Sequence, residues 1–448
     1  MPVPTPADLA EYARRRRTLM KAIGKHGVAI IPAATEQTRN RDVEYRFRQD
    51  SDFWYLTGFR EPEAVLVLAP GRKEGEFLLF VRPRDPERET WTGYRAGPEG
   101  AERDYAADQA WNLDELDTRL PALLSGREQV HCTLGEHPAF DTRLTTCVRR
   151  LRETSRRGNG APVGFTVLDE TLHEQRLIKR PAELKLLRRA CDVSAQAHVR
   201  AMRYSRPGVY EYQLMAKIEH EFALAGMEPG YGTIVGGGAN ACVLHYVEND
   251  CVLRDGDLVL IDAGGELQGY TADITRTFPV NGRFSAAQRE VYEVVLAAQL
   301  AAIDEMRVGR LQVRPHTAAV KVLVEGMVAL GILHGEVAEL IETEGYRRFY
   351  MHGTGHWLGL DVHDVGRYRI DGKPRPFEAG MVMTSEPGLY IPPGSEGVDA
   401  RFHGIGIRIE DDVLVTAKGP EVLTGGVPKK VDDIEALMAD AAATRPRK

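Results

Sequence analysis

A chain of 448 residues, of which 43% are hydrophobic and 27% charged, has enough apolar material for a packed core, which excludes disorder for most of its length. The length favours two or three domains, and we expect two. Because 58 basic and 65 acidic side chains leave a net charge of only −7, no field of one sign argues for nucleic acid as a partner.

The first predicted element is a helix that begins near Pro6 and carries the basic run ARRRR, which we interpret as a solvated helix face. No apolar run reaches the roughly 18 residues of a membrane span, and no hydrophobic segment follows the N-terminal positive charges. The scattered cysteines, odd in number and without CxxC spacing, support neither a disulfide framework nor a zinc knuckle. We therefore expect a cytoplasmic protein with no membrane partner.

Residues 1–175 alternate helical and strand patterns, which predicts a small N-terminal α/β domain. A second domain, residues 176–438, is predicted to open on a long amphipathic helix with Pro181 in its first turn. In this domain a group of helices followed by a group of strands occurs twice, which indicates an internal duplication. We expect one curved sheet covered by helices, in an α/β (α+β) fold. Residues 439–448 are predicted to form a flexible tail.

Two aspartates mark the ends of two facing strands predicted within VLIDAGGELQGYTADITRTFPV. Because side chains alternate along a strand, Asp273 shares a face with Thr275 and Thr277, and both Asp262 and Asp273 can face one cavity. Buried like charges repel, and each unpaired carboxylate would cost several kcal/mol or take up a proton. A positive group between the two is therefore expected.

Three histidines, His352, His356 and His363, lie in the segment MHGTGHWLGLDVHDVG. The first two have the spacing of a helical metal motif, but Gly353 and Gly355 would weaken a helix. We therefore predict an extended segment.

Two more acids lie at predicted strand ends. In GMVMTSEPGLYI the strand ends at Glu386, because Pro387 cannot donate to a ladder and forces a turn. In HGIGIRIEDDVLV the alternation places Arg408 and Glu410 on one face.

Four carboxylates and one imidazole at such positions match a pair of metal ions that activate a bridging hydroxide, although each acid alone is more often a salt-bridge partner. Oxygen-rich ligation without thiolate favours Mn²⁺ for the two divalent ions, or Co²⁺ in vitro, over a tetrahedral structural zinc. The candidate ligands are Asp262, Asp273, His356, Glu386 and Glu410.

Four segments carry a family resemblance: IDAGGELQGYTADITRTFPVNG, HGTGHWLGLDVHDVG, SEPGLYI and GIGIRIEDD. They closely resemble aminopeptidase P, the Xaa-Pro aminopeptidases of the pita-bread metallopeptidase family M24. The segment FRQDSDFWYLTGFREPEAVLVL resembles the non-catalytic N-terminal domain of the same enzymes. The resemblance implies an N-terminal aminopeptidase P-type domain, a pita-bread catalytic domain, and hydrolysis of peptides with proline in the second position.

The resemblance also implies roles for the ligands. Asp262 would be a bidentate ligand of one ion, and His356 and Glu386 would bind the other. Asp273 and Glu410 would bridge the two ions.

Further residues complete the implied site. The resemblance makes His245, His352 and His363 substrate-contacting histidines; His245 would stabilise the oxyanion, while His352 and His363 would position the prolyl side and pass a proton to the leaving nitrogen. Glu386 would accept the proton of the hydroxide. For Arg408 two roles stay open: orienting these groups, or keeping the carboxylates ionised.

Proline recognition needs an apolar or aromatic wall, because the ring offers no N–H. Tyr390, Tyr231 and Trp91 are the candidates for it. In similar enzymes the tryptophan of the N-terminal domain reaches a neighbouring subunit's site, which implies a homo-oligomer, either a tetramer or a dimer.

Two other functions stay open. A prolidase shares the metal ligands but cleaves only dipeptides that end in proline. The segment GHWLGLDVHD and the long N-terminal domain favour the aminopeptidase. A pita-bread module that has lost catalysis would serve as a binding scaffold. Such modules typically lack one or more of the liganding acids, and all are present here.

Overall fold

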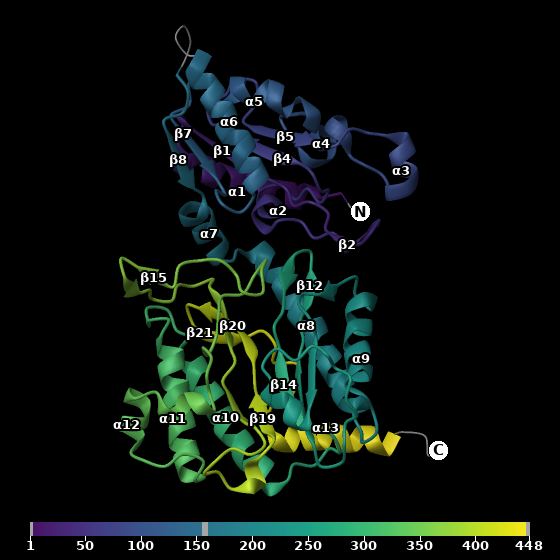
Figure 1. Ribbon diagram of the computed structural model, residues 1–448, viewed down its shortest axis with the longest axis vertical. Coiled ribbons are helices and arrows are strands. Elements are labelled where there is room, and N and C mark those ends of the chain that lie inside the picture. Colours follow the sequence, from purple (N-terminus) through teal and green to yellow (C-terminus); the bar gives the residue numbers. More distant parts are fainter. Residues whose placement is uncertain (1–2, 155–159, 445–448) are drawn as a thin grey trace. The chain divides into compact units, whose positions relative to one another are not determined.

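The computed structural model describes residues 3–154 and 160–444, and the chain divides after Gln175 into two compact units (Figure 1). Within the described residues, no helix combines the length and the apolar character that crossing a membrane would require.

The first unit is a mixed α/β domain, as predicted. From the N-terminus its elements are α1 (Pro6–Ile23), β1 (Gly27–Pro32), β2 (Thr38–Asn40), β3 (Val43–Glu44), α2 (Ser51–Thr57), β4 (Val65–Leu68), β5 (Phe77–Val81), α3 (Pro86–Thr92), α4 (Gly97–Tyr105), β6 (Gln109–Asn112), α5 (Leu116–Leu124), β7 (Gln129–Cys132), α6 (Pro138–Thr154) and β8 (Gly164–Val167). Helix α7 (Asp169–Leu177) follows, and its last two residues, Arg176 and Leu177, belong to the second unit. Six of the strands form one sheet in the order β6-β5-β4-β1-β7-β8. Apolar side chains of this sheet and of α5 and α6 form the core.

Helix α1 begins at Pro6, as predicted, but its basic run is not a solvated face throughout. Arg15 and Arg16 are each 4% exposed. They donate to the backbone oxygens of Tyr55 at 3.1 Å and Leu56 at 2.8 Å. These carbonyls lie in the last turn of α2, where the helix ends and no later backbone N–H of the helix can donate to them. The two guanidinium groups supply these hydrogen bonds instead.

The second unit repeats one order of elements. Its elements are α8 (Pro181–Tyr204), α9 (Glu211–Leu224), β9 (Glu228–Pro229), β10 (Ile234–Gly237), β11 (Leu258–Asp262), β12 (Gly265–Leu267), β13 (Tyr270–Thr271), β14 (Thr275–Pro279), α10 (Ala286–Glu305), α11 (Arg314–Ala329), α12 (Val337–Glu342), β15 (Arg369–Ile370), β16 (Lys373–Pro374), β17 (Val382–Ser385), β18 (Gly388–Ile391), β19 (Ile405–Arg408), β20 (Asp411–Thr416), β21 (Gly419–Val422) and α13 (Val431–Thr444). The helix pair α8–α9 precedes one group of strands, and the pair α10–α11 precedes another. In Figure 1 the strands β14, β19 and β20 lie between the two helix pairs.

The predicted single curved sheet is divided into separate hydrogen-bonded ladders, among them β10-β11-β14, β18-β19 and β17-β20-β21. The second unit has two halves, the first from α8 to β14 and the second from α10 to β21. The two halves nevertheless meet along β14. The backbone N–H of Glu410 donates to the oxygen of Thr275 at 3.0 Å, and the hydroxyl of Thr277 donates to the oxygen of Arg408 at 3.0 Å. Because β19 ends at Arg408 and β20 begins at Asp411, the chain changes ladders there, beside Glu410.

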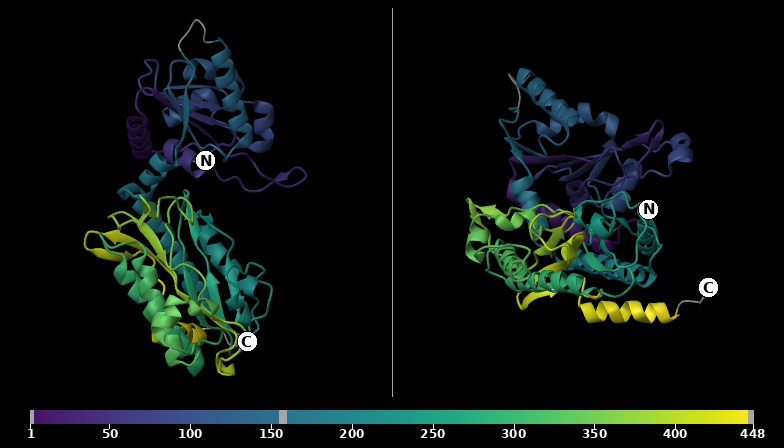
Figure 2. Two further views of the ribbon diagram at one scale, coloured as in Figure 1. Left: turned by 60° about the vertical axis from the view of Figure 1, so that its left-hand side comes forward. Right: turned by 60° about the horizontal axis from the view of Figure 1, so that its bottom comes forward.

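Both ends of the second unit are helical. Helix α8 starts at Pro181 as predicted, and the Glu183 carboxylate accepts the backbone N–H of Arg180 at 2.9 Å. Residues 439–444 of the predicted flexible tail are helical and continue α13 (Figure 2). Alanine favours helix, and Met438 and Ala441 are buried where α13 packs on α8 and α10. Residues 445–448 lie outside the described residues.

Candidate active site

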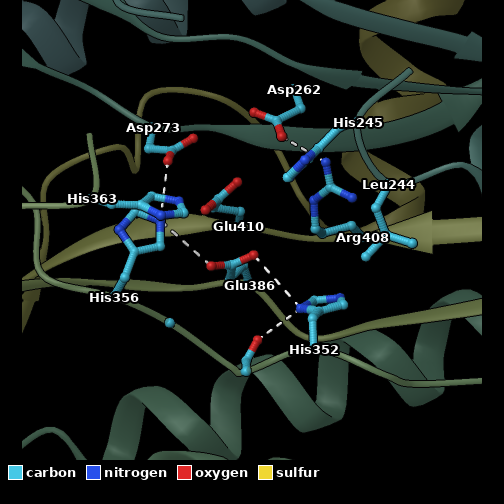
Figure 3. A pocket seen from close by; sticks show the side chains of 12 residues that line it. Leu244, His245, Asp262, Asp273, His352, His356, His363, Glu386, Arg408 and Glu410 are labelled. Carbon is cyan, nitrogen blue, oxygen red and sulfur yellow. Dashed lines mark hydrogen bonds and ion pairs between the residues drawn. The ribbon is translucent and has the colours of Figure 1, made fainter. Parts of the chain in front are cut away.

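A pocket of about 320 Å³ in the second unit gathers side chains from both halves (Figure 3). It brings together all five predicted metal ligands, the three predicted histidines and the predicted arginine. Its lining residues are Leu244, His245, Asp262, Asp273, His352, Gly353, Gly355, His356, His363, Glu386, Arg408 and Glu410.

The two aspartates face each other across a tyrosine. Asp262 is the last residue of β11, whereas Asp273 lies in an irregular stretch before β14 and not in the predicted strand. The Tyr231 hydroxyl lies 2.6 Å from the Oδ1 atom of each. Tyr231 was predicted to form a wall for proline. Its hydroxyl instead links the two carboxylates, and because it has one proton it donates to one of them at a time.

Arg408 occupies the side of the pocket next to Asp262. Its Nη2 donates to Asp262 Oδ2 at 2.6 Å, its Nε to the Thr275 hydroxyl at 3.0 Å and its Nη1 to the Tyr390 hydroxyl at 3.1 Å. Burial raises the pKa of Asp262, and the charge of Arg408 opposes that rise.

His356 lies between two carboxylates. Its Nε2 is 3.4 Å from Asp273 Oδ2 and 3.6 Å from Glu386 Oε1, while its Nδ1 is 3.0 Å from the backbone oxygen of Trp357. Burial opposes protonation, but Asp273 raises the pKa of His356 to about 9. Although burial acts to raise the pKa of Asp273, the hydrogen bond with His356 holds it below its usual value. With Nδ1–H bonded to the carbonyl, the Nε2 atom is the one available to a metal.

The two glutamates are held by threonines and by backbone. The N–H of Glu386 donates to Thr354 O at 2.9 Å, and the Thr384 hydroxyl donates to Glu386 Oε1 at 3.3 Å. The Thr275 hydroxyl donates to Glu410 Oε2 at 2.6 Å. Burial raises the pKa of Glu386 to about 7. Burial and then the neighbouring carboxylates raise the pKa of Glu410 well above its usual value.

The donor set is rich in buried carboxylates. Four carboxylates share a buried pocket with Arg408 and His356, and the raised pKa values of Glu386 and Glu410 reflect their burial and the repulsion among the ionised forms. Ligand atoms of Asp273, His356 and Glu410 lie within 4.8 Å of one another. Divalent cations that prefer oxygen ligands fit this set in charge and in chemistry.

The three other predicted histidines line the same pocket. His352 places Nδ1 2.7 Å from Gly353 O and Nε2 2.8 Å from the Tyr390 hydroxyl, and burial lowers its pKa to about 4. The His363 ring lies against His356 with centroids 3.9 Å apart. His245 is exposed at the pocket, which differs from the satisfied core position that a lone histidine in CVLHY usually takes. The segment with His352 and His356 is not helical, as predicted.

The two remaining aromatic candidates do not line this pocket. Tyr390 is 0% exposed, and its hydroxyl holds His352 and Arg408, so it does not fit the predicted wall for proline. Trp91 lies in α3 of the first unit and is 87% exposed.

Sequence reasoning missed two supports of the site. Thr275 accepts from Arg408 and donates to Glu410, a role that the strand alternation placing it on the pocket face could have suggested. The backbone N–H of Asp273 donates to Asp412 Oδ2 at 3.0 Å. Asp412 could have been found as the third consecutive acid in the strand pattern IEDDVLV, because a buried carboxylate needs a donor.

Comparison with known proteins gives consistent matches along the chain. The model of metallopeptidase family M24 matches residues 185–417, and the model of the aminopeptidase P N-terminal domain matches residues 12–131. The Xaa-Pro aminopeptidase of Escherichia coli K12 is 48% identical over 433 residues, which cover 96% of this chain and 98% of the relative. Human Xaa-Pro aminopeptidase 3 is 36% identical, with coverage of 96% and 86%.

Solved structures match over nearly the full length. Aminopeptidase PepP of Pseudomonas aeruginosa superposes with a TM-score of 0.96 at 53% identity, covering 99% of this chain and 100% of that chain. Aminopeptidase P of E. coli with the inhibitor Pro-Leu gives a TM-score of 0.94 at 47% identity, with coverage of 97% and 99%.

Proposed function

The chain belongs to metallopeptidase family M24, and from this premise we propose that it is an Xaa-Pro aminopeptidase, a hydrolase that removes the N-terminal residue of a peptide when proline follows. One observation carries the proposal: ligand-type side chains from segments far apart in the sequence converge in one buried pocket. The similarity to Xaa-Pro aminopeptidases over both units supports the same activity.

We propose that the pocket holds two divalent ions, and that these are Mn²⁺. Asp262 would bind one ion, His356 and Glu386 the other, and Asp273 and Glu410 would be shared. The support is the excess of buried carboxylates and their oxygen-rich chemistry. Such ions supply a Lewis acid for the scissile carbonyl and lower the pKa of water to make a nucleophile.

The other pocket residues act on substrate in this proposal. His245, exposed at the pocket, would donate to the carbonyl oxygen of the first residue as negative charge develops there. Glu386 would take up the proton that the attacking water loses. His352 and His363 would position the prolyl side and deliver a proton to the leaving nitrogen. The carboxylates would also favour a free N-terminal amine over an internal peptide nitrogen.

We propose that Arg408 has both of the roles that its sequence position left open. Its guanidinium contacts Asp262, Thr275 and Tyr390 together, which fixes the position of one proposed ligand and of the hydroxyl that holds His352. The same contacts place its charge beside Asp262, so the two roles coexist.

The assembly and the location of the protein are also proposals. We propose a homo-oligomer, a tetramer or a dimer, in which Trp91 contributes to a neighbouring subunit's site; its 87% exposure supports this. We propose a cytoplasmic location, which the free cysteines support.

A prolidase is the main competing function, and the relatives do not favour it. The E. coli aminopeptidase P structure holds Pro-Leu, in which a residue follows proline as it would in the product from a longer peptide. Mass spectrometry of products from Arg-Pro-Pro, Arg-Pro and Arg-Ala-Pro, with metal analysis of the same sample, tests the proposal. We expect release of arginine from Arg-Pro-Pro. Cleavage of Arg-Pro alone would identify a prolidase, and no cleavage with no bound metal would identify a binding module.

A further inference from the structure

The loop that carries His363 is held by a buried ion-pair network outside the pocket. Arg176 Nη2 lies 2.6 Å from Asp361 Oδ2 and 2.6 Å from Asp364 Oδ1, and Lys179 Nζ lies 2.7 Å from Asp364 Oδ2. The side chains of Arg176, Lys179 and Asp364 are 3%, 1% and 1% exposed. These four charged residues, which we call the His363 anchor, do not line the pocket.

The anchor holds the loop on both sides of His363. Asp361 lies two residues before the histidine and Asp364 one residue after it. The backbone N–H of Asp364 also donates to Trp357 O at 2.8 Å, which closes the loop at its base. The loop backbone is therefore tied on both sides of the histidine by contacts of the flanking acids.

The ion pair is packed directly on the loop backbone. A Cβ added at Gly359 would lie 2.2 Å from Asp364 Oδ2 and 2.8 Å from Lys179 Cε, so only glycine fits there. The Gly359 oxygen accepts the N–H of Thr271, at the end of the strand that leads to Asp273. The anchor thus joins the histidine loop to the segment that carries one of the proposed ligands.

Stability alone does not account for such a network. Removing these charges from water costs free energy that their attraction can fail to recover, so a buried ion-pair network is weak evidence for a stabilising role. The His363 side chain is exposed, and its ring contacts His356 at a centroid distance of 3.9 Å. A side chain that must meet a substrate needs a rigid support.

We propose that Arg176 and Lys179 are positioning residues for hydrolysis, which act through Asp361 and Asp364 to hold His363 at the pocket. The inference rests on the proposed function, because it assigns the anchor to that reaction. The anchor residues themselves do not touch the substrate.

The test is a double-mutant cycle between the anchor and the histidine. Lys179→Met keeps the apolar stem and removes the charge. In the wild-type background we expect kcat on Arg-Pro-Pro to fall by about 10- to 100-fold, at unchanged metal content. In the His363→Ala background the same change should cause no further fall, because both act on one group.

Two further variants serve as controls. Lys179→Arg should recover part of the rate. Arg188→Met, which breaks the remote ion pair with Glu421, should have no effect.

An equal loss in both backgrounds, or no loss in either, would overturn the inference. If Lys179→Met does not fold, Asp361→Asn in the same two backgrounds gives the same comparison, since Asp361 is 36% exposed and less tied to the core. Wild-type protein without activity on Arg-Pro-Pro would overturn the proposed function as well. An active wild type with additive losses would overturn the positioning alone.

Discussion

Arg408 Nη2 lies 2.6 Å from Asp262 Oδ2, and this ion pair joins the two halves of the second unit. Asp262 ends β11 in the first half, and Arg408 ends β19 in the second. The remaining guanidinium donors reach Thr275 and Tyr390, and the arginine is 3% exposed. Three acceptors in different directions match the planar fork of a guanidinium and not the point charge of an ammonium.

Arg408→Lys is therefore expected to be a damaging change. The ammonium cannot reach all three acceptors, so Asp262 and Tyr390 would lose their fixed positions, and kcat/KM on Arg-Pro-Pro should fall about 100-fold. Steady-state kinetics check this, with Arg289→Lys as the control, because Arg289 pairs with Asp432 at the exposed surface. Wild-type kinetics in Arg408→Lys would refute the positioning role.

Asp273→Ala and Glu410→Ala should each abolish turnover. Each removes a carboxylate proposed to be shared by both ions, so metal content should fall together with activity. Metal analysis and the peptide assay are made on the same samples. Glu421→Ala, which removes a partly exposed carboxylate paired with Arg188, should change neither. Retention of more than a small fraction of activity in either variant would contradict the two-ion scheme.

His352→Ala should separate catalysis from metal binding. The imidazole is held by Tyr390 and Gly353 and is not among the proposed ligands. We expect wild-type metal content with a fall in kcat. Tyr390→Phe, which removes only the hydroxyl bonded to Nε2, should cause a smaller fall in kcat. Loss of metal in His352→Ala to the extent seen in Asp273→Ala would show that His352 is itself a ligand.

Metal removal should lower the melting temperature. Ions that bind only the folded state add about 2.7 kcal/mol at a concentration 100 times their Kd, and a chelator withdraws this contribution. Thermal unfolding with and without chelator measures it. Asp273→Ala, with its site already broken, should respond much less. A melting temperature that the chelator does not move in the wild type would argue against a metal site in the folded protein.

Arg16→Met should destabilise the first unit. The buried guanidinium satisfies Leu56 O at the end of α2, and loss of the donor leaves that carbonyl unsatisfied, at a cost of about 1–3 kcal/mol. Denaturant unfolding monitors the change. The neighbouring Arg17→Met offers a matched control, because Arg17 is exposed and its replacement should stay within about 0.5 kcal/mol. Equal effects of the two changes would show that the buried contact is not the cause.

Much of the candidate site was predictable because strand alternation is a local property. The period of two placed Arg408 and Glu410 on one face, and both line the pocket. The turn forced by Pro387 marked Glu386 as a strand end, and β17 ends at the residue before it. The bonds of the Tyr231 and Tyr390 hydroxyls could not be predicted, because they join segments distant in sequence, and the sequence alone suggested only that both rings were apolar walls.

The fold was predictable in class and in element order, and less so where tertiary contacts override local pattern. Arg15 and Arg16 belong to a run of charge that normally faces solvent, but the open end of α2 offers carbonyls that only a buried donor can satisfy. The last turn of α13 ends in alanines that look unstructured near a terminus, but the buried Met438 gives this helix a surface to pack on.

The proposed ligands are divided between the two halves of the second unit, with Asp262 and Asp273 from the first and His356, Glu386 and Glu410 from the second. Neither half carries enough donors to hold both ions alone. The site is therefore incomplete until both halves of the second unit have folded against each other, so either half made alone should lack the full set of proposed ligands.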